Sequence, residues 1–136
     1  MATYDNLPVY KASYDLLLEL YTISKNMERD FKFTLGEKIK NEVTDLIVNV
    51  YRANCRVDKI KLIEDARENI EVVRLLMRLY KDLKQIKTEE YVSVSQKIES
   101  VSKQLAAWQN SQQKQKTSHL QGQSLQGLFA VDERTD

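Results

Sequence analysis

Residues 37–56 read EKIKNEVTDLIVNVYRANCR, and the fold class follows from this pattern. Apolar residues recur in it every three or four positions, which places them on one face of a helix. These residues are Ile39, Val43, Leu46, Ile47, Val50 and Ala53. Charged residues and asparagines occupy the opposite side. The stretch therefore predicts an amphipathic helix that buries one face against other helices.

Three further segments have the same spacing of apolar residues. The first spans residues 8–26 and opens with a proline, which suits the first turn of a helix. The other two span residues 58–86 and 88–108, and Asp58 and Thr88 are suitable N-caps for them. The apolar face predicted for the first segment carries Tyr10, Tyr14, Leu17, Leu20 and Tyr21, and Leu16, Ile23 and Met27 widen it. In the last segment the apolar residues form a near-heptad seam.

The connections between these segments indicate how the helices are arranged. Thr34-Leu35-Gly36-Glu37 has the Thr-x-x-Glu spacing of a capping box, which predicts Thr34 as the N-cap of the helix over residues 37–56. The connections at 57–58 and 86–88 are short, so neighbouring helices should run antiparallel.

Composition agrees with an all-helical fold. The 136 residues include only three glycines and one proline, too few for a turn-rich β architecture. The sequence therefore predicts an all-α, up-down-up-down antiparallel four-helix bundle over residues 1–116. From residue 109 the chain is rich in Gln, Ser and Lys and has no sustained apolar stripe. Residues 117–136 are predicted to form a polar, flexible C-terminal extension.

The sequence carries no signal for export or for a membrane. The N-terminal residues lack the basic start and apolar run of a secretory signal. No uncharged apolar stretch of about 18 residues, the length needed to span a bilayer, occurs. A single cysteine, Cys55, excludes a disulfide within the chain. We expect a cytoplasmic protein.

The residues that usually carry catalysis are isolated here. His119, the only histidine, lies in the polar extension without partners for a triad or a metal cluster. Acidic groups such as Glu64, Asp65 and Glu68 lack the Glu-x-x-His pairs of di-metal bundles. No glycine-rich phosphate loop or hydrolase motif is present. The sequence predicts a protein that is not an enzyme and that binds no metal or cofactor.

Positive charge is concentrated in the middle of the chain. Residues 29–87 carry fourteen basic and ten acidic side chains, a net charge of +4. At 100° per residue, one stripe on the third segment collects Arg67, Arg74, Arg78 and Lys81 within about 60°. A second group, around the turn between the second and third segments, consists of Arg52, Arg56, Lys59 and Lys61.

These basic groups have three interpretations. In the first, they are solvated side chains with partners four residues away, such as Arg67 with Glu71 and Arg78 with Asp82. Alternatively, in a ring of identical subunits, the stripe becomes a continuous positive band that binds a phosphate backbone. The same arginines could also form bidentate contacts with acidic groups of a protein partner.

The third segment has more apolar surface than three partner helices can cover. Eight apolar residues occur within residues 72–83, wider than a single buried stripe. A contiguous exposed apolar patch usually marks an interface, so we expect a homo-oligomer. Asp65 and Asn69 lie on the same core-facing side, which predicts hydrogen bonds between helices.

Three runs of sequence together resemble a known family. They are FTLGEKI at 33–39, NVYRAN at 49–54 and LLMRLYKDL at 75–83, and the opening LPVYKA at 7–12 adds to the likeness. They resemble the four-helix-bundle family of the accessory variability determinant (Avd) proteins of diversity-generating retroelements. Proteins encoded by intervening sequences in bacterial large-subunit ribosomal RNA genes belong to the same broad group. The likeness covers about residues 5–110.

The resemblance implies a non-catalytic protein that assembles as a pentamer. It implies binding to a reverse transcriptase and, through backbone contacts, to RNA or DNA, in support of error-prone cDNA synthesis. Arg78 and Lys81 match the family's Arg-Leu-x-Lys-Asp-Leu pattern; Arg74, Arg52 and Arg56 follow on position and charge. Residues 1–116 carry twenty basic and seventeen acidic side chains, far less basic than the strongly basic rings of the family. The alternative is a structural protein of the ribosomal intervening-sequence type, oligomeric but without a reverse transcriptase partner.

Overall fold

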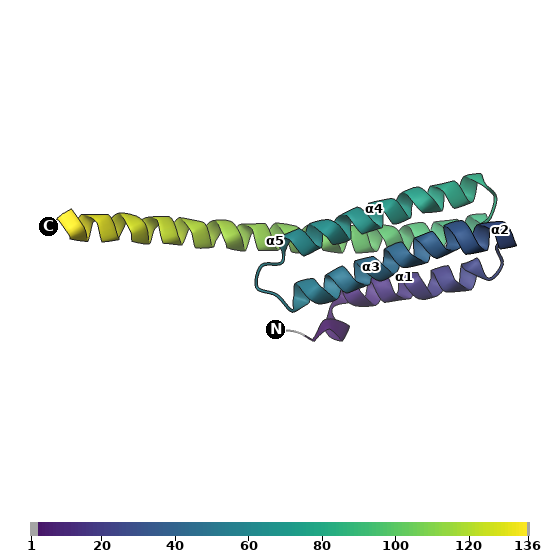
Figure 1. Cartoon of the computed structure of the whole chain (residues 1–136), viewed down its shortest axis with the longest axis horizontal. Coiled ribbons are helices and arrows are strands. Elements are labelled where there is room, and N and C mark those ends of the chain that lie inside the picture. The colour runs from purple at the N-terminus through teal and green to yellow at the C-terminus, as the bar shows by residue number, and fades with distance from the viewer. Residues whose placement is uncertain (1–2, 136) are drawn as a thin grey trace.

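Four long helices of alternating direction build the protein (Figure 1). In this computed structural model the backbone of residues 3–135 and the side chains of residues 3 and 5–122 are described. The long helices are α1 (Pro8–Ser24), α3 (Glu37–Asn54), α4 (Ile60–Asp82) and α5 (Thr88–Thr135). A 3-10 turn, Tyr4–Asn6, precedes α1, and the short α2 (Arg29–Phe31) and a π-helix (Lys32–Gly36) join α1 to α3.

The helices occupy the corners of a square in cross-section. α1 packs on α3 and α5, and α4 packs on the same two helices, so α1 and α4 lie at diagonal corners. Each helix runs antiparallel to the two that it contacts (Figure 1). The predicted all-α, up-down-up-down bundle is confirmed.

The core contains one stripe from each helix, as amphipathic periodicity requires. The stripe predicted on α3 is confirmed: five of its six residues are buried, and Ile47 is partly buried against them. The matching stripe of α5 is Val94, Ile98, Val101 and Leu105, all buried, with Trp108 packed at its end. The near-heptad seam read from the sequence is therefore a core seam.

The buried face of α1 is narrower than the one predicted. Leu16, Leu20 and Ile23 are buried as predicted, but Tyr14 and Tyr21 are about half exposed. The buried residues of α1 are Val9, Ser13, Leu16, Leu20, Ile23 and Ser24. The hydroxyl of Ser13 donates to the carbonyl of Val9 over 2.7 Å, so a polar residue is accommodated without an unpaired donor. Tyr21 lies on the flank of α1 that is directed toward α3.

The predicted capping box before α3 is wrong. The chain does not leave the helical conformation at Thr34 but winds through the π-helix directly into α3. The hydroxyl of Thr34 therefore donates to the carbonyl of Asp30 over 2.6 Å, one turn earlier, and caps nothing. Gly36 is buried in this segment, close to the phenol oxygen of Tyr80.

Asp58 is not the N-cap of α4 either. The residue at that position is Lys59, and its side chain makes no cap hydrogen bond to α4. Its ammonium instead donates to carbonyls at the end of α3, including that of Ala53 over 2.9 Å. A cation at a helix C-terminus satisfies unpaired carbonyls and complements the negative end of the dipole.

α5 begins at Thr88 but extends beyond residue 108, where the predicted apolar seam ends. Glu89 and Glu90 lie in its first turn, and the carboxylate of Glu90 accepts from the backbone N–H of Lys87 over 3.1 Å. Between residues 110 and 122 the side chains are exposed apart from that of Gln112, which is partly buried, and the helix continues to Thr135 and projects beyond the bundle (Figure 1). The side chains of residues 123–136, which belong to the predicted flexible extension, lie outside the described residues.

Candidate interaction surface around α4

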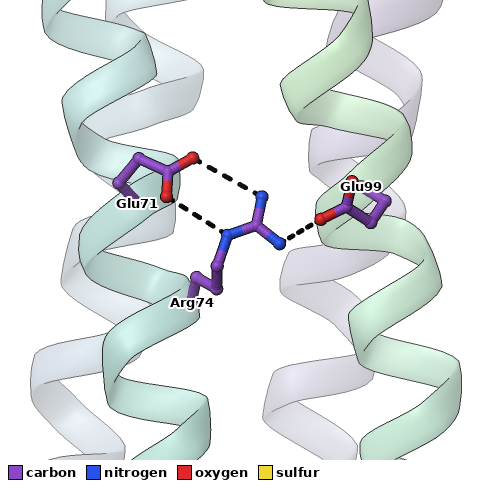
Figure 2. Close-up of polar contacts among 3 residues, drawn as sticks. All are labelled: Glu71, Arg74 and Glu99. Atoms are coloured by element: carbon purple, nitrogen blue, oxygen red, sulfur yellow. Dashed lines mark hydrogen bonds and ion pairs between the residues drawn. The ribbon is translucent and has the colours of Figure 1, made fainter.

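Arg74 lies between α4 and α5 and contacts carboxylates on both helices (Figure 2). Its Nε and Nη2 donate to Glu71 over 3.2 and 3.5 Å, and its Nη1 donates to Glu99 of α5. Partial burial lowers the pKa of Arg74, but the hydrogen bonds and charges of Glu99 and Glu71 outweigh it, so the pKa of Arg74 is raised. The positive charge at this position is therefore compensated by two carboxylates.

Arg78 and Lys81 continue the stripe toward the end of α4. The Nε of Arg78 lies 3.5 Å from the carboxylate of Asp82, which confirms the predicted pair four residues apart. The Lys81 ammonium lies 4.8 Å from the ring centroid of Tyr91 on α5, within the range of a cation–π contact. Both basic side chains are exposed.

Arg67 has a different partner from the one predicted. Its guanidinium does not pair with Glu71 but donates to the amide oxygen of Gln109 over 2.6 Å, joining α4 to α5. Gln109 is buried. Among the described residues no carboxylate pairs with Arg67, so its charge is held in place without being neutralised by an ion pair.

The four residues of the predicted basic group at the α3–α4 turn do not share one environment. Lys59 is directed to the end of α3, as described above. Lys61 pairs with Asp65 over 2.9 Å, and this hydrogen bond, followed by the charge of Asp65, raises the pKa of Lys61. Arg52 and Arg56 are exposed, and no described carboxylate pairs with either. Three of the four cations are therefore exposed, but only Arg52 and Arg56 have no ion-pair or carbonyl partner among the described residues.

A polar network joins α3 to α4 below this turn. The amide of Asn49 donates to the side-chain oxygen of Asn69 over 2.8 Å, and the amide of Asn69 donates to the Glu42 carboxylate over 2.7 Å. The predicted inter-helix hydrogen bonds are confirmed for Asn69. Asp65 does not take part, because it pairs with Lys61 on its own helix.

The surplus apolar surface predicted on α4 is present. Leu75 is 68% exposed, and Leu79 and Leu83 are each about two-fifths exposed. Leu75 lies next to the basic stripe, about 60° around the helix from Arg78, and Leu79 and Leu83 lie further from it. α4 therefore presents charged and apolar side chains to solvent on adjoining flanks, a composition typical of interfaces.

The described residues contain no arrangement suited to metal chemistry. In the described part of the chain, no three side chains of His, Cys, Asp or Glu are grouped so that they could hold a metal ion. Cys55 and His119 are both exposed and lie on different elements. None of the described helices combines the length and the apolar composition that a membrane crossing requires.

A family model described as bAvd-like matches residues 9–112. The chain belongs to the bAvd-like family. This confirms the resemblance to the Avd proteins, an accessory, non-catalytic type. The match covers the four-helix bundle and ends where α5 leaves it. A comparison with curated proteins found no match.

The structure of this bAvd-like protein adds residues that sequence reasoning did not find. Glu99 and Gln109 on α5 fix the orientation of Arg74 and Arg67, although they are far from them in the chain. The signal that could have found them is the antiparallel register of α4 and α5, which brings these residues level. The half-exposed tyrosines of α1 were also missed as surface residues.

Proposed function

We propose that the chain is a non-catalytic accessory protein of a diversity-generating retroelement. It acts in the cytoplasm as a homo-oligomer, expected to be a pentamer, and binds a reverse transcriptase and its template RNA or cDNA to support error-prone cDNA synthesis. The observation that carries the proposal is membership of the bAvd-like family over residues 9–112. This match favours the Avd function over that of the ribosomal intervening-sequence proteins.

The basic side chains that lack an ion pair support nucleic-acid contact at one end of the bundle. Arg52, Arg56 and Arg67 have no carboxylate partner among the described residues, so their charges are available to a phosphate. Lys114 and Lys116 are exposed on α5, where it leaves the bundle near the α3–α4 turn. Contacts of this kind bind a phosphate backbone without reading sequence.

The compensated arginines favour a protein partner. Arg74 and Arg78 already contact carboxylates, and a phosphate would have to displace them. An enzyme surface that offers carboxylates in a bidentate arrangement fits these arginines. We therefore assign the reverse transcriptase to α4 and the nucleic acid to the α3–α4 turn.

Co-purification of the reverse transcriptase with two charge variants tests this division. The first replaces Arg78 and Lys81 with Glu, and it is expected to lose the enzyme but to retain RNA binding. The second replaces Arg52, Arg56 and Arg67 with Glu; it is expected to lose RNA binding and to flatten its salt dependence, since each lost phosphate contact reduces the slope by about one.

A matched control replaces Arg29, Lys38 and Lys87, which are exposed at the other end of the bundle, with Glu. It changes the net charge as much as the second variant and is expected to behave as wild type. Loss of both partners in the control would show that net charge alone governs binding. Normal retention of the enzyme and of RNA by both test variants would overturn the assignment.

A further inference from the structure

Two exposed apolar patches lie on helices at opposite corners of the bundle. One, the α1 face, consists of Tyr14, Leu18 and Tyr21; the other, the α4 face, consists of Leu75 and Leu79. The central leucines, Leu18 and Leu75, are 51% and 68% exposed. Two different patches on opposite sides of one molecule are what a head-to-tail contact between copies requires.

The level of Leu18 along the bundle is set by an ion pair with α5. Glu19 of α1 pairs with Lys97 of α5. Because the two helices are antiparallel, the residue before Glu19 is level with the residue after Lys97. Leu18 therefore lies at the level of Ile98, a core residue of α5.

The ion pair between Arg74 and Glu99 sets the level of Leu75 in the same way. α4 and α5 are antiparallel, so the residue after Arg74 is level with the residue before Glu99. That places Leu75 at the level of Ile98 as well. Leu18 and Leu75 consequently leave the bundle at one level, on opposite sides.

The charges on either side of the two leucines are complementary. Lys11 and Lys25 lie seven residues before and after the leucine of the α1 face, which is two helical turns in each direction. Glu68 and Asp82 lie at the same two positions around the leucine of the α4 face. All four side chains are exposed. One face is therefore positive, apolar and positive in turn. The other is negative, apolar and negative, with Arg78 beside Asp82 at 3.5 Å.

We propose that the α1 face of one copy binds the α4 face of the next in a closed ring whose axis is parallel to the bundle. α1 and α4 run in the same direction (Figure 1), so a rotation about such an axis preserves both direction and level. The contacts formed are Leu18 with Leu75, Lys11 with Glu68, and Lys25 with Asp82. This inference rests on the homo-oligomer of the proposed function and names its interface.

Both faces are displaced toward α3, which makes the assembly a ring rather than a filament. Tyr21 contacts α3 through Lys40, and Leu79 lies two turns after Val72, which lines a groove together with α3 residues. The two faces therefore meet at less than a straight angle on the α3 side, and successive copies curve around it. α3 faces the ring axis, while α5 and its contacts with Arg67 and Arg74 stay outside.

Engineered cysteines test the pairing in the full chain. In a Cys55→Ser background, the double variant Leu18→Cys/Leu75→Cys is expected to form a ladder of disulfide-linked oligomers on mild oxidation. Leu18→Cys alone and Leu75→Cys alone are expected to remain uncrosslinked. In the proposed interface residue 18 of one copy contacts residue 75 of the next copy, so two identical cysteines do not come together. Crosslinked dimers of either single variant would show a two-fold interface and would overturn the proposal, as would a monomeric wild-type chain by light scattering.

Charge reversal provides a second measurement. Lys11→Glu/Lys25→Glu is expected to dissociate the oligomer, and so is Glu68→Lys/Asp82→Lys. The fourfold variant that combines them is expected to restore it, since the two faces are complementary again. If the fourfold variant were as dissociated as either double variant, the assigned charge pairs would be wrong.

The two proposals fail in different ways. A disulfide ladder from a protein that binds neither reverse transcriptase nor RNA would refute the proposed function and leave the ring intact. Conversely, an oligomer that binds both partners but gives no ladder would refute this interface alone.

Discussion

Arg74 of α4 donates a hydrogen bond to the carboxylate of Glu99 on α5, so one ion pair connects the helix that carries the basic stripe to its neighbour (Figure 2). The contact holds the guanidinium in place and also reduces the positive potential of the stripe. It thereby explains why the row of arginines on α4 does not make this surface strongly basic.

Glu99→Gln is therefore expected to strengthen binding of the reverse transcriptase. The change leaves Arg74 with one carboxylate and raises the local charge by one, which corresponds to a roughly two- to fivefold tighter affinity at low salt. Fluorescence anisotropy with a labelled reverse transcriptase measures the effect, and raising the salt concentration should reduce it. Asp30→Asn makes the same change in charge in the α1–α3 connection and is expected to have a smaller effect. Equal effects of the two variants would mean that the enzyme senses only the net charge.

Asn49 and Asn69 are expected to be energetically coupled. Replacing Asn69 with alanine leaves the amide of Asn49 without this acceptor, and replacing Asn49 leaves the side-chain oxygen of Asn69 without this donor. Each single change should cost about 1–2 kcal/mol of unfolding free energy. Because the lost hydrogen bond is shared, the double variant should cost about 1 kcal/mol less than the sum. Urea unfolding of the four proteins in the cycle measures this coupling. Gln104 and Ser100, an exposed pair on α5, are expected to show almost none, and additive costs at the asparagines would argue against the network.

Gly36→Ala is expected to stabilise the protein. Gly36 has helical dihedral angles, φ −59° and ψ −45°, so alanine is not strained there. An added Cβ would meet the Phe31 carbonyl at 3.5 Å and the Tyr80 phenol oxygen at 3.7 Å, which are ordinary contacts. Alanine loses less backbone entropy on folding, so the free energy of unfolding should rise by about 0.5–1 kcal/mol. A fall in the thermal midpoint would show that the π-helix depends on the missing side chain.

Tyr80→Phe is expected to be harmless or stabilising. Within the described part of the chain the phenol oxygen of Tyr80 is buried and has no hydrogen-bond partner. Such a group carries a desolvation penalty of about 1–3 kcal/mol that phenylalanine avoids while retaining the ring. Chemical denaturation measures the difference, and the exposed Tyr14→Phe is a control that should be neutral. A loss above about 1 kcal/mol would reveal a hydrogen bond to Tyr80.

The advantage of Tyr80→Phe should grow at alkaline pH. Burial, followed by the negative charge of Glu37, raises the pKa of Tyr80 above its ordinary value. Above that ordinary value, near pH 10, the unfolded chain releases a proton that the folded chain retains, so the wild-type protein loses stability as the pH rises. Stability curves of the two proteins that stay parallel from pH 8 to 11 would contradict this.

Local periodicity was enough to predict the helices, because amphipathic spacing depends only on residues that are close together in the chain. The core faces of α3 and α5 were predicted correctly for this reason. The face of α1 was predicted too wide, because this helix carries two candidate stripes about a quarter-turn apart. The stripe that contains Leu16 is buried and the one that contains Tyr14 is not, since the partner helices cover only the first.

The tertiary structure decided the partners of the charged residues. The sequence allowed Arg67 and Glu71 to pair, since they are one turn apart, but Glu71 binds Arg74 and Arg67 reaches Gln109 on another helix. Likewise Thr34 could cap α3 by its spacing, but the chain enters α3 without an interruption to cap. The spacing of residues along the sequence predicts which of them share a helix face. Only the register between antiparallel helices brings distant side chains level, and that register placed Arg74 beside Glu99 and aligned Leu18 with Leu75.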